Sequence, residues 1–388
     1  MNAMEKLLFT EEHQIFRDTM KSFLKTEVEP FNKKWEAERK VDRALFKKAG
    51  DLGIFGLHAP VEYGGSGLDY SYAMVQSEEL GYSGFSGVAT ALGAHQYLAM
   101  TYLLNSEEDY IIEKYIKPSI AGTFVGCLGM TEPNAGSDLM AIKTVAVKDG
   151  DHYVINGSKT FISNGFYGDY MVTAVKTNPE AGAGGVSMIL IDLNTPGVTK
   201  SKLEKLGIHS SDTAEIGLSD VRVPVANLIG SEGLGFYYMM KNLVIERMTI
   251  VWGCITGAER LLEDTLAYMK DRKAFGKPID KFQALRHRIV DIATEIESCK
   301  AFTYLTTYRH IQGENVVKEC AMLKLQAADL LNKVAYECLQ FHGGYGFIEE
   351  YPIARAYRDA RIQNIYGGSS EIMKEIISKM VIDGVTYG

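Results

Sequence analysis

Glu246 is the residue whose surroundings most clearly suggest chemistry. It lies in a predicted helix whose neighbouring positions are largely apolar, among them Val244, Ile245, Met248 and Val251. A helix that is apolar all round is normally buried, and a buried carboxylate is costly unless it is paired or used. Burial also raises the pKa of a carboxyl group and so makes it a stronger base. Glu246 is therefore a candidate general base.

A structural ion pair is the alternative interpretation of Glu246. Arg247 is the nearest cation in the sequence. Adjacent helical residues point about 100° apart, however, so the two side chains are poorly placed to pair with each other. A lysine elsewhere in the chain would serve instead. On the apolar pattern alone, both interpretations stand.

A second candidate site is the segment 130–138 (MTEPNAGSD). Its Pro, Asn and Gly residues favour a turn that exposes successive backbone N–H groups. Thr131, Ser137 and Asp138 add short polar side chains. Such a loop can hydrogen-bond a planar heterocycle and the phosphates beside it. An ordinary surface turn between strands is the alternative.

Five segments, in order along the chain, resemble signatures of the acyl-CoA dehydrogenase family. Residues 130–138 resemble its flavin-binding pattern T-E-P-x-A-G-S-D, and 161–165 (FISNG) resemble its second flavin segment. Residues 272–279 (RKAFGKPI) and 340–346 (QFHGGYG) resemble its R-x-x-F-G-x-x-I and Q-x-x-G-G-x-G elements. Residues 365–372 (IYGGSSEI) resemble its active-site turn. Each match alone is weak, whereas the ordered set is specific and spans nearly the whole chain.

The final turn departs from the family pattern at Gly367. In most members a Glu follows the Tyr and acts as the base, but here Tyr366 is followed by glycine. The subgroup acting on long-chain and isovaleryl thioesters carries its base on the long helix instead, at the position of Glu246. The resemblance therefore favours Glu246 as the catalytic base. It also implies that Gly367 contributes its backbone N–H to the thioester carbonyl, together with a flavin ribityl hydroxyl.

The reaction implied by the resemblance is FAD-dependent α,β-dehydrogenation of an acyl-CoA thioester to the trans-enoyl-CoA. Glu246 would remove the α proton and flavin N5 would accept the β hydride. Backbone N–H donors would polarise the carbonyl as enolate character develops. Reduced flavin would then pass electrons to an electron-transfer flavoprotein, and the family is usually a homotetramer, a dimer of dimers.

The resemblance also assigns binding roles to matching positions. The cofactor-binding residues that it implies are Leu128, Met130, Thr131, Gly136, Ser137, Phe161, Ile162, Ser163, Arg272, Phe275, Gln283, Gln340, Gly343, Gly344, Ser369, Ser370 and Glu371. The substrate-binding residues are Ser137, Tyr237, Val244, Arg247, Tyr366, Gly367 and Gly368. Those holding the FAD adenine and diphosphate, such as Arg272 and Phe275, would act across a subunit boundary. Phe161 stands where many relatives have Trp.

The pattern along the chain changes from helix to strand and back to helix. Residues 1–120 predict a helical domain, 121–233 a β domain that binds flavin, and 234–388 a helical bundle carrying the base and the oligomer contacts. Asn156-Gly157 predicts the two-residue turn of a hairpin. The resemblance implies the acyl-CoA dehydrogenase fold, an α+β class that is mainly α, with a β-barrel-like middle domain and a four-helix bundle.

Individual elements are predicted from periodicity and from Gly, Pro and Asn breaks. Thr10 predicts the start of a helix with an apolar stripe through Ile15, Phe16, Met20, Phe23 and Leu24. Further predicted helices cover 42–52, 69–82, 234–271, 280–311, 315–341 and 369–384. Further predicted strands cover 170–176, 186–192 and 214–223.

Composition limits the class of protein. The net charge of −8 argues against nucleic-acid binding, which normally needs a basic face. The five cysteines are scattered without zinc-ligand spacing, which favours reduced thiols in a reducing compartment and no metal site. No apolar run reaches the roughly 18 residues of a membrane span. The N-terminus resembles no targeting signal, so we expect a cytoplasmic enzyme or, in a eukaryote, a mature mitochondrial matrix form.

Two alternatives remain beside an acyl-CoA dehydrogenase. One is an acyl-carrier-protein-linked dehydrogenase or an oxidase, although acyl-CoA oxidases usually have extra C-terminal sequence. The other is a non-catalytic flavoprotein that serves as a binding or assembly module. Acyl chain length is open, because residues 365–376 look more like the long-chain type and 93–100 look closer to isovaleryl enzymes.

Overall fold

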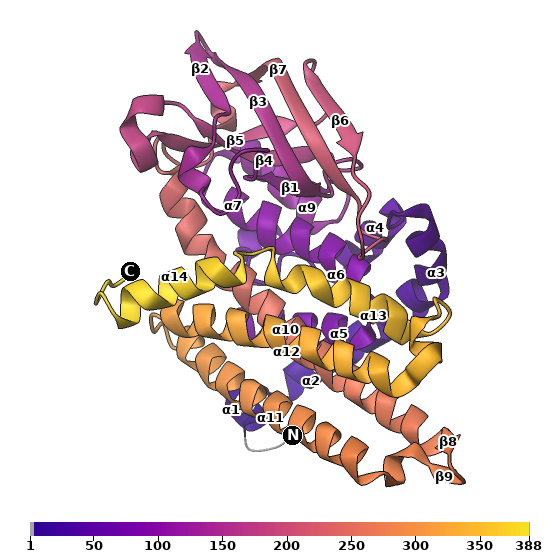
Figure 1. Cartoon of the computed structure of the whole chain (residues 1–388). Helices are drawn as coiled ribbons and strands as arrows, with labels where there is room; N and C mark the ends of the chain where they lie inside the picture. The colour runs from indigo at the N-terminus through magenta and orange to yellow at the C-terminus, as the bar shows by residue number, and fades with distance from the viewer. Residues whose placement is uncertain (1–3, 388) are drawn as a thin grey trace.

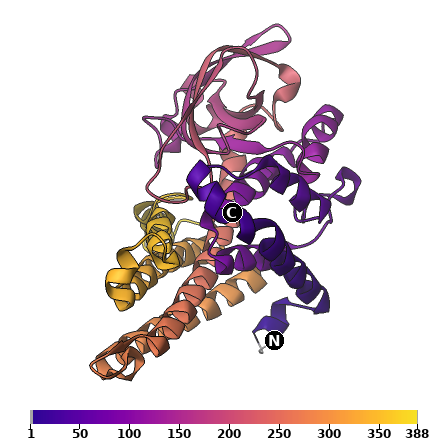
Figure 2. The same ribbon diagram turned by 90° about the vertical axis from the view of Figure 1, so that its right-hand side faces the viewer.

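The computed structural model describes residues 4–387 and places a curled sheet above two groups of helices (Figure 1). Residues 1–3 and 388, the outer ends of the predicted first and last domains, lie outside the described residues. The two ends of the described part of the chain lie on the helical side of the molecule, away from the sheet (Figures 1 and 2).

The N-terminal part consists of short helices. Its α-helices are α1 (Glu5–Leu8), α2 (Glu11–Phe23), α3 (Glu29–Glu38), α4 (Arg43–Asp51), α5 (Tyr70–Ser83), α6 (Ser86–Gly93), α7 (Thr101–Leu103), α8 (Asp109–Ile111) and α9 (Lys117–Ile120). Its π-helical turns are η1 (Leu24–Val28), η3 (Ala94–Met100) and η4 (Ile112–Ile116). The predicted cap at Thr10 is confirmed: its backbone N–H donates to His13 Nδ1 over 3.1 Å at the start of α2. Of the predicted stripe, Met20 and Phe23 are buried, but Ile15 is 68% exposed because it lies one helical step, about 100°, off the buried line.

The sheet consists of β1 (Gly126–Gly129), β2 (Val145–Asp149), β3 (His152–Ser163), β4 (Tyr170–Lys176), β5 (Val186–Asp192), β6 (Val198–Lys202) and β7 (Thr213–Pro224). Its hydrogen-bonded path is β1-β4-β2-β3-β7-β6, and β5 also pairs with β4. β1 and β4 run parallel, with Gly126 opposite Tyr170. β4 and β5 are buried along almost their whole length, as strands covered on both faces should be.

The predicted hairpin at Asn156-Gly157 is wrong. Residues on both sides of it belong to the single strand β3, and the pairing with β7 shifts register between Ile155 and Gly157. The side chain of Asn156 accepts from Asp220 N over 2.8 Å and donates to Asp220 Oδ1 over 3.0 Å. Asn-Gly therefore forms a bulge against the neighbouring strand, where glycine relieves crowding against Thr144.

The C-terminal part contains long helices, at nearly the bounds predicted. They are α10 (Gly235–Asp271), α11 (Gln283–Ile311), α12 (Val317–His342) and α14 (Ser370–Val381), with a small hairpin of β8 (Lys273–Ala274) and β9 (Lys277–Pro278) between the first two. The shorter helix α13 (Pro352–Ala360) was not predicted. α10 connects the two main cores: Met239 packs in the core under the sheet, and Trp252 packs in the core of the helical bundle. Glu246 lies between these two residues, so the residue with candidate chemistry sits where the sheet and the bundle meet.

Candidate active site

A cavity of about 2300 Å³ lies at this junction. Its walls come from α6 and η3, from α10, from the ends of β1 and β3, and from the turn before α14. The cavity brings together most of the residues predicted to act on cofactor or substrate. These are Leu128, Met130, Thr131, Gly136, Ser137, Phe161, Ile162, Ser163, Tyr237, Val244, Glu246, Arg247, Tyr366, Gly367, Gly368 and Ser369.

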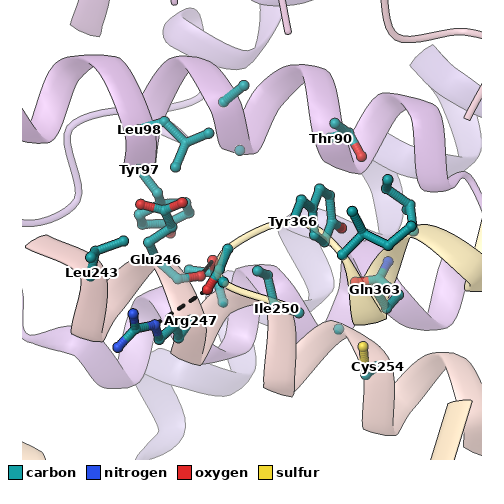
Figure 3. Close-up of a pocket in the computed structure, with 18 of the residues that line it drawn as sticks. Thr90, Tyr97, Leu98, Leu243, Glu246, Arg247, Ile250, Cys254, Gln363 and Tyr366 are labelled. Atoms are coloured by element: carbon teal, nitrogen blue, oxygen red, sulfur yellow. Dashed lines mark hydrogen bonds between the residues drawn. The ribbon is translucent and has the colours of Figure 1, made fainter. Parts of the chain in front are cut away.

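Glu246 is a buried carboxylate without a charged partner at ion-pair distance among residues 4–387. Its residue is 9% exposed, and Oε2 is buried with no hydrogen-bond partner. Burial raises the pKa of Glu246 to about 7, although the nearby charges of Arg247 and Lys324 oppose that rise. Figure 3 shows its side chain in the cavity below Tyr97. A structural ion pair, the alternative considered from the sequence, therefore does not explain why this carboxylate is buried.

Arg247 points to the turn before α14 rather than to Glu246. Its Nε donates to the carbonyl oxygen of Gly367 over 3.3 Å (Figure 3). From another side, Lys324 of α12 donates from Nζ to the carbonyl oxygens of Gln363 and Gly368, each over 2.7 Å. Two buried cations therefore hold this turn through its backbone.

The backbone at Gly367 favours glycine. Its φ is +63° and that of Gly368 is +96°, a region that residues other than glycine rarely adopt. An added Cβ at Gly367 would lie 2.5 Å from Ile250 Cδ1, so the end of that side chain would have to move. A carboxylate at this position would therefore strain the observed turn. Within residues 4–387 no acceptor takes the N–H of Gly367, which leaves a free donor beside the cavity.

The predicted flavin loop is anchored by a buried ion pair that sequence reasoning missed. Lys159 Nζ donates to Glu132 Oε1 over 2.7 Å and to the carbonyl of Met130 over 3.3 Å. Glu132 also accepts from the N–H groups of Lys143 and Thr144 over 2.5 and 3.0 Å. Burial alone would raise the pKa of Glu132, but Lys159 holds it below its ordinary value. The ionised pair fixes the loop that leads into Thr131 and Ser137.

The cavity wall beside this loop suits a planar aromatic ring. Phe161 lies at a break in the β3 register, has φ +60° and is 70% exposed although it is large and apolar. The hydroxyls of Thr131 and Ser163 border the same cavity, and an added Cβ at Gly136 would meet nothing within 4 Å. An open aromatic face edged by small polar groups is the surface that a flavin would cover. The residues present therefore fit the implied cofactor.

The second half of the predicted cofactor site lies elsewhere in the chain. Residues of this group that do not line the cavity are Arg272, Phe275, Gln283, Gln340, Gly343, Gly344, Ser370 and Glu371. β8 and β9, which flank Phe275, project from the end of the bundle opposite to the sheet (Figure 1). Phe275 has φ +51°, precedes Gly276 in a tight turn and is 95% exposed. One chain alone thus separates the two halves of the predicted FAD site.

The remaining walls are mostly apolar and include residues that sequence reasoning did not assign. Thr90, Leu98, Leu243, Ile250, Cys254 and Gln363 join Tyr97 and Tyr366 around the cavity (Figure 3). Gln363 and Tyr366 lie in the segment before α14, and the others come from α6, η3 and α10, whose spacing indicates a core face. No sequence signal distinguishes core from cavity here, because both require apolar side chains.

Family models match three consecutive regions of the chain. Their descriptions are "Acyl-CoA dehydrogenase, N-terminal domain" for residues 10–123, "middle domain" for 127–221 and "C-terminal domain" for 233–382. The chain belongs to the acyl-CoA dehydrogenase family. The fold expected from the resemblance is confirmed: mainly helical, with a curled sheet between two helical parts.

Named relatives extend the match over almost the whole chain. The long-chain specific acyl-CoA dehydrogenase of Sus scrofa mitochondria is 40% identical over 97% of this chain and 87% of its own length. The isovaleryl-CoA dehydrogenase of Pongo abelii mitochondria is 35% identical over 95% of this chain and 88% of its own. The crystal structure of an acyl-CoA dehydrogenase from Geobacillus kaustophilus superposes with a TM-score of 0.93 at 39% identity, covering 96% of this chain and 99% of that one.

These matches show an oxidoreductase that acts on acyl-CoA, a FAD-dependent acyl-CoA dehydrogenase by class. Family members are flavoproteins, in agreement with the aromatic wall at Phe161. Of the helices in residues 4–387, none combines the length and the apolar character that a membrane crossing requires.

Proposed function

We propose that this chain dehydrogenates a long-chain acyl-CoA between its α and β carbons, with Glu246 as the base. The observation that carries the proposal is the buried, unpartnered carboxylate of Glu246 beside a turn in which Gly367 has no side chain. Helix α10 thus supplies a base, whereas the turn at Gly367 supplies only backbone groups.

Glu246 accepts the α proton of the bound thioester. Apolar neighbours exclude water, so the charged form is less stabilised and the carboxylate is more basic than in solution. A pKa of about 7 leaves it substantially ionised near neutral pH yet able to take the proton. Bound FAD supplies the acceptor for the hydride that leaves the β carbon.

Gly367 donates its free N–H to the thioester carbonyl. Negative charge develops on that oxygen as the α proton leaves, and a donor already fixed in place stabilises it without reorganising. Arg247 holds the carbonyl of the same residue over 3.3 Å. Tyr366 and Gly368 border the thioester on either side of the donor.

FAD is the cofactor, held by two copies of the chain. Phe161, Thr131 and Ser163, which line the cavity, would hold its flavin ring. A second copy contributes the group containing Arg272 and Phe275 to the adenine and diphosphate. Support comes from the 95% exposure of Phe275 and from the planar fork of arginine, which suits phosphate. The assembly is a homotetramer built as a dimer of dimers.

The open space beside Gly93 suits a long acyl chain. Gly93 lines the cavity, and an added Cβ there would meet nothing within 4 Å. A glycine inside a helical segment costs stability relative to alanine, so open space is a physical reason for glycine here. The long-chain specific name of a relative at 40% identity supports the same length class.

Electrons leave through an electron-transfer flavoprotein, and the enzyme acts in a bacterial cytoplasm or a mitochondrial matrix. Support comes from the family and from relatives of this chain, which include bacterial and mitochondrial proteins. A solved structure at 34% identity is described as an electron transferring flavoprotein of Acidaminococcus fermentans.

The test is an anaerobic titration of the holoenzyme with acyl-CoAs from butyryl to palmitoyl, together with isovaleryl-CoA. We expect palmitoyl-CoA to bleach the visible flavin band most completely. In a Gly93→Leu variant, we expect palmitoyl-CoA to lose this effect while butyryl-CoA keeps its own. If FAD stays bound but none of the acyl-CoAs bleaches the flavin band, the proposal is contradicted. That result would favour a carrier-protein substrate or a non-catalytic flavoprotein.

A further inference from the structure

Lys324 is a buried lysine that the proposed mechanism leaves without a role. It lies on α12, its residue is 0% exposed, and its Nζ donates to the carbonyls of Gln363 and Gly368 over 2.7 Å each. These two carbonyls lie on either side of Tyr366 and Gly367 in the sequence. A single ammonium therefore closes the turn that carries the thioester donor.

The charge of Lys324 is costly where it lies. Among residues 4–387 no carboxylate is within ion-pair distance of it, and burial lowers its pKa to about 8. Taking a charge out of water is expensive unless good hydrogen bonds satisfy it. The carbonyl oxygens of Gln363 and Gly368 are the acceptors that satisfy this one.

The turn itself needs an external anchor. Gly367 and Gly368 both have positive φ, and glycine loses more backbone freedom on ordering than any other residue. Neither glycine has a side chain that could pack and hold the turn. Arg247 binds the carbonyl of Gly367 from the α10 side, and Lys324 binds the turn from the α12 side.

We propose that Lys324 is a positioning residue for the oxyanion donor. By tying Gln363 to Gly368, it fixes the peptide between Tyr366 and Gly367 so that its N–H meets the thioester carbonyl. The inference rests on the proposed function. It adds that the geometry of the donor is set by a cation that does not itself line the cavity.

Asn332 provides a matched control on the same helix. Its Nδ2 donates to the carbonyl of Ala360 over 2.8 Å and to Asn364 Oδ1 over 2.6 Å. It therefore anchors the segment just before the turn through partly buried hydrogen bonds, but no hydrogen bond joins it to Gly368. Loss of this anchor should lower stability without moving the donor.

The experiment compares Lys324→Met, Lys324→Gln and Asn332→Leu holoenzymes with wild type. Each is mixed anaerobically with palmitoyl-CoA, and the limiting rate of flavin reduction and the apparent Kd are measured separately. We expect Lys324→Met to reduce flavin about 100-fold more slowly, because misplacement of a fixed group by about 1 Å has that effect, with Kd changed less than about threefold. Lys324→Gln, which keeps a donor on a shorter side chain, should fall between. Asn332→Leu should lower the melting temperature and keep the wild-type rate.

A spectroscopic readout separates positioning from stability. In a Glu246→Gln background the thioester binds without turnover, and isotope-edited infrared spectra of a carbonyl-labelled acyl-CoA report the strength of the hydrogen bond to it. We expect the carbonyl band to move toward its free position when Lys324→Met or Lys324→Gln is added, and not when Asn332→Leu is added.

Any of three results would overturn the inference. The first is flavin reduction at the wild-type rate in Lys324→Met, and the second is a carbonyl band that stays where it is in the Glu246→Gln background alone. The third is a loss of rate in Asn332→Leu equal to that in Lys324→Met. If Lys324→Met does not retain FAD, the Lys324→Gln holoenzyme decides by the same criteria. Failure of the proposed function is distinguishable, because wild type itself would then not be reduced by any acyl-CoA.

Discussion

Glu246 is suited to proton abstraction because its carboxylate is buried and its Oε2 has no partner. The sequence predicted this candidate from an acidic residue in an apolar helix, and from the glycine at position 367. The structure adds a physical reason for that glycine, since the positive φ and the contact with Ile250 both disfavour a side chain. What sequence could not predict is the convergence of Arg247 and Lys324 on one turn, because the contacts join α10, α12 and the segment before α14.

The raised pKa of Glu246 predicts the pH dependence of the chemical step. Only the carboxylate form accepts a proton, so the anaerobic rate of flavin reduction should rise with pH through about 7 and then level. Below that pH the rate should fall about tenfold per unit, as for a single titrating group. Stopped-flow reduction across this range checks the prediction. A flat profile through neutral pH would contradict it.

The same pKa predicts a stability difference between wild type and Glu246→Gln. A carboxyl group whose folded pKa, about 7, exceeds its ordinary 4.5 stabilises the fold fully only below the lower value and loses that contribution as pH rises through the higher one. The Gln variant has no such titration. Its melting temperature, measured on substrate-free holoenzyme, should therefore exceed that of wild type increasingly from about pH 5 to pH 8. A constant difference would argue against a buried, titrating Glu246.

Helix α10 is placed for this role by its close crossing with α5. An added Cβ at Gly81 would lie 2.6 Å from Gly253 Cα and from Thr256 Oγ1, and Thr256 Oγ1 donates to the carbonyl of Glu78 over 2.9 Å. The two helices therefore meet backbone to backbone a short distance along α10 from Glu246.

The crossing predicts opposite outcomes for two glycines that face each other. Gly81→Ala should destabilise the protein by about 1–3 kcal/mol, because overpacking pushes the helices apart. Gly253→Ala should be neutral or slightly stabilising, because its added Cβ would meet nothing closer than 3.6 Å and alanine favours helix. Denaturant unfolding of the two variants measures both effects. Equal destabilisation would show that the crossing is looser than described.

The sequence predicted the bounds of helices and strands well where an apolar pattern continues over many residues. The bounds of α10 and of β4 lie within a residue of prediction, because sustained apolar patterns reflect burial directly. Asn156-Gly157 failed because its turn propensity is local, whereas the hydrogen bonds from Asn156 to Asp220 come from a strand far along the chain. The buried pair of Lys159 and Glu132 was missed for the same reason.

The whole molecule presents the two halves of its cofactor site at separate places. The flavin wall lies under the sheet, and the hairpin carrying Phe275 projects from the far end of the bundle (Figures 1 and 2). Signature segments identify both halves in the sequence, but sequence order says nothing about their separation in one chain. An assembly in which two copies of the chain pack together would bring the two halves of the cofactor site side by side.

Phe275→Asp should therefore reduce FAD content and assembly size together. Because Phe275 is 95% exposed in the single chain, its loss should leave the unfolding transition of the cofactor-free subunit unchanged. Val61→Asp, at another apolar residue with 69% exposure, is the control and should change neither property. Flavin absorbance per subunit and light scattering after size-exclusion chromatography provide the measurements. Full FAD content in a smaller species would contradict a shared site.

The most direct measurement of the central claim is single-turnover flavin reduction in Glu246→Gln and wild type. Both holoenzymes are mixed anaerobically with palmitoyl-CoA under the same conditions, and FAD content and acyl-CoA binding are confirmed for each. The account predicts rapid bleaching in wild type and a rate lower by at least about 100-fold in the variant, since a general base contributes on that order. Bleaching of Glu246→Gln at the wild-type rate would show that another group removes the α proton.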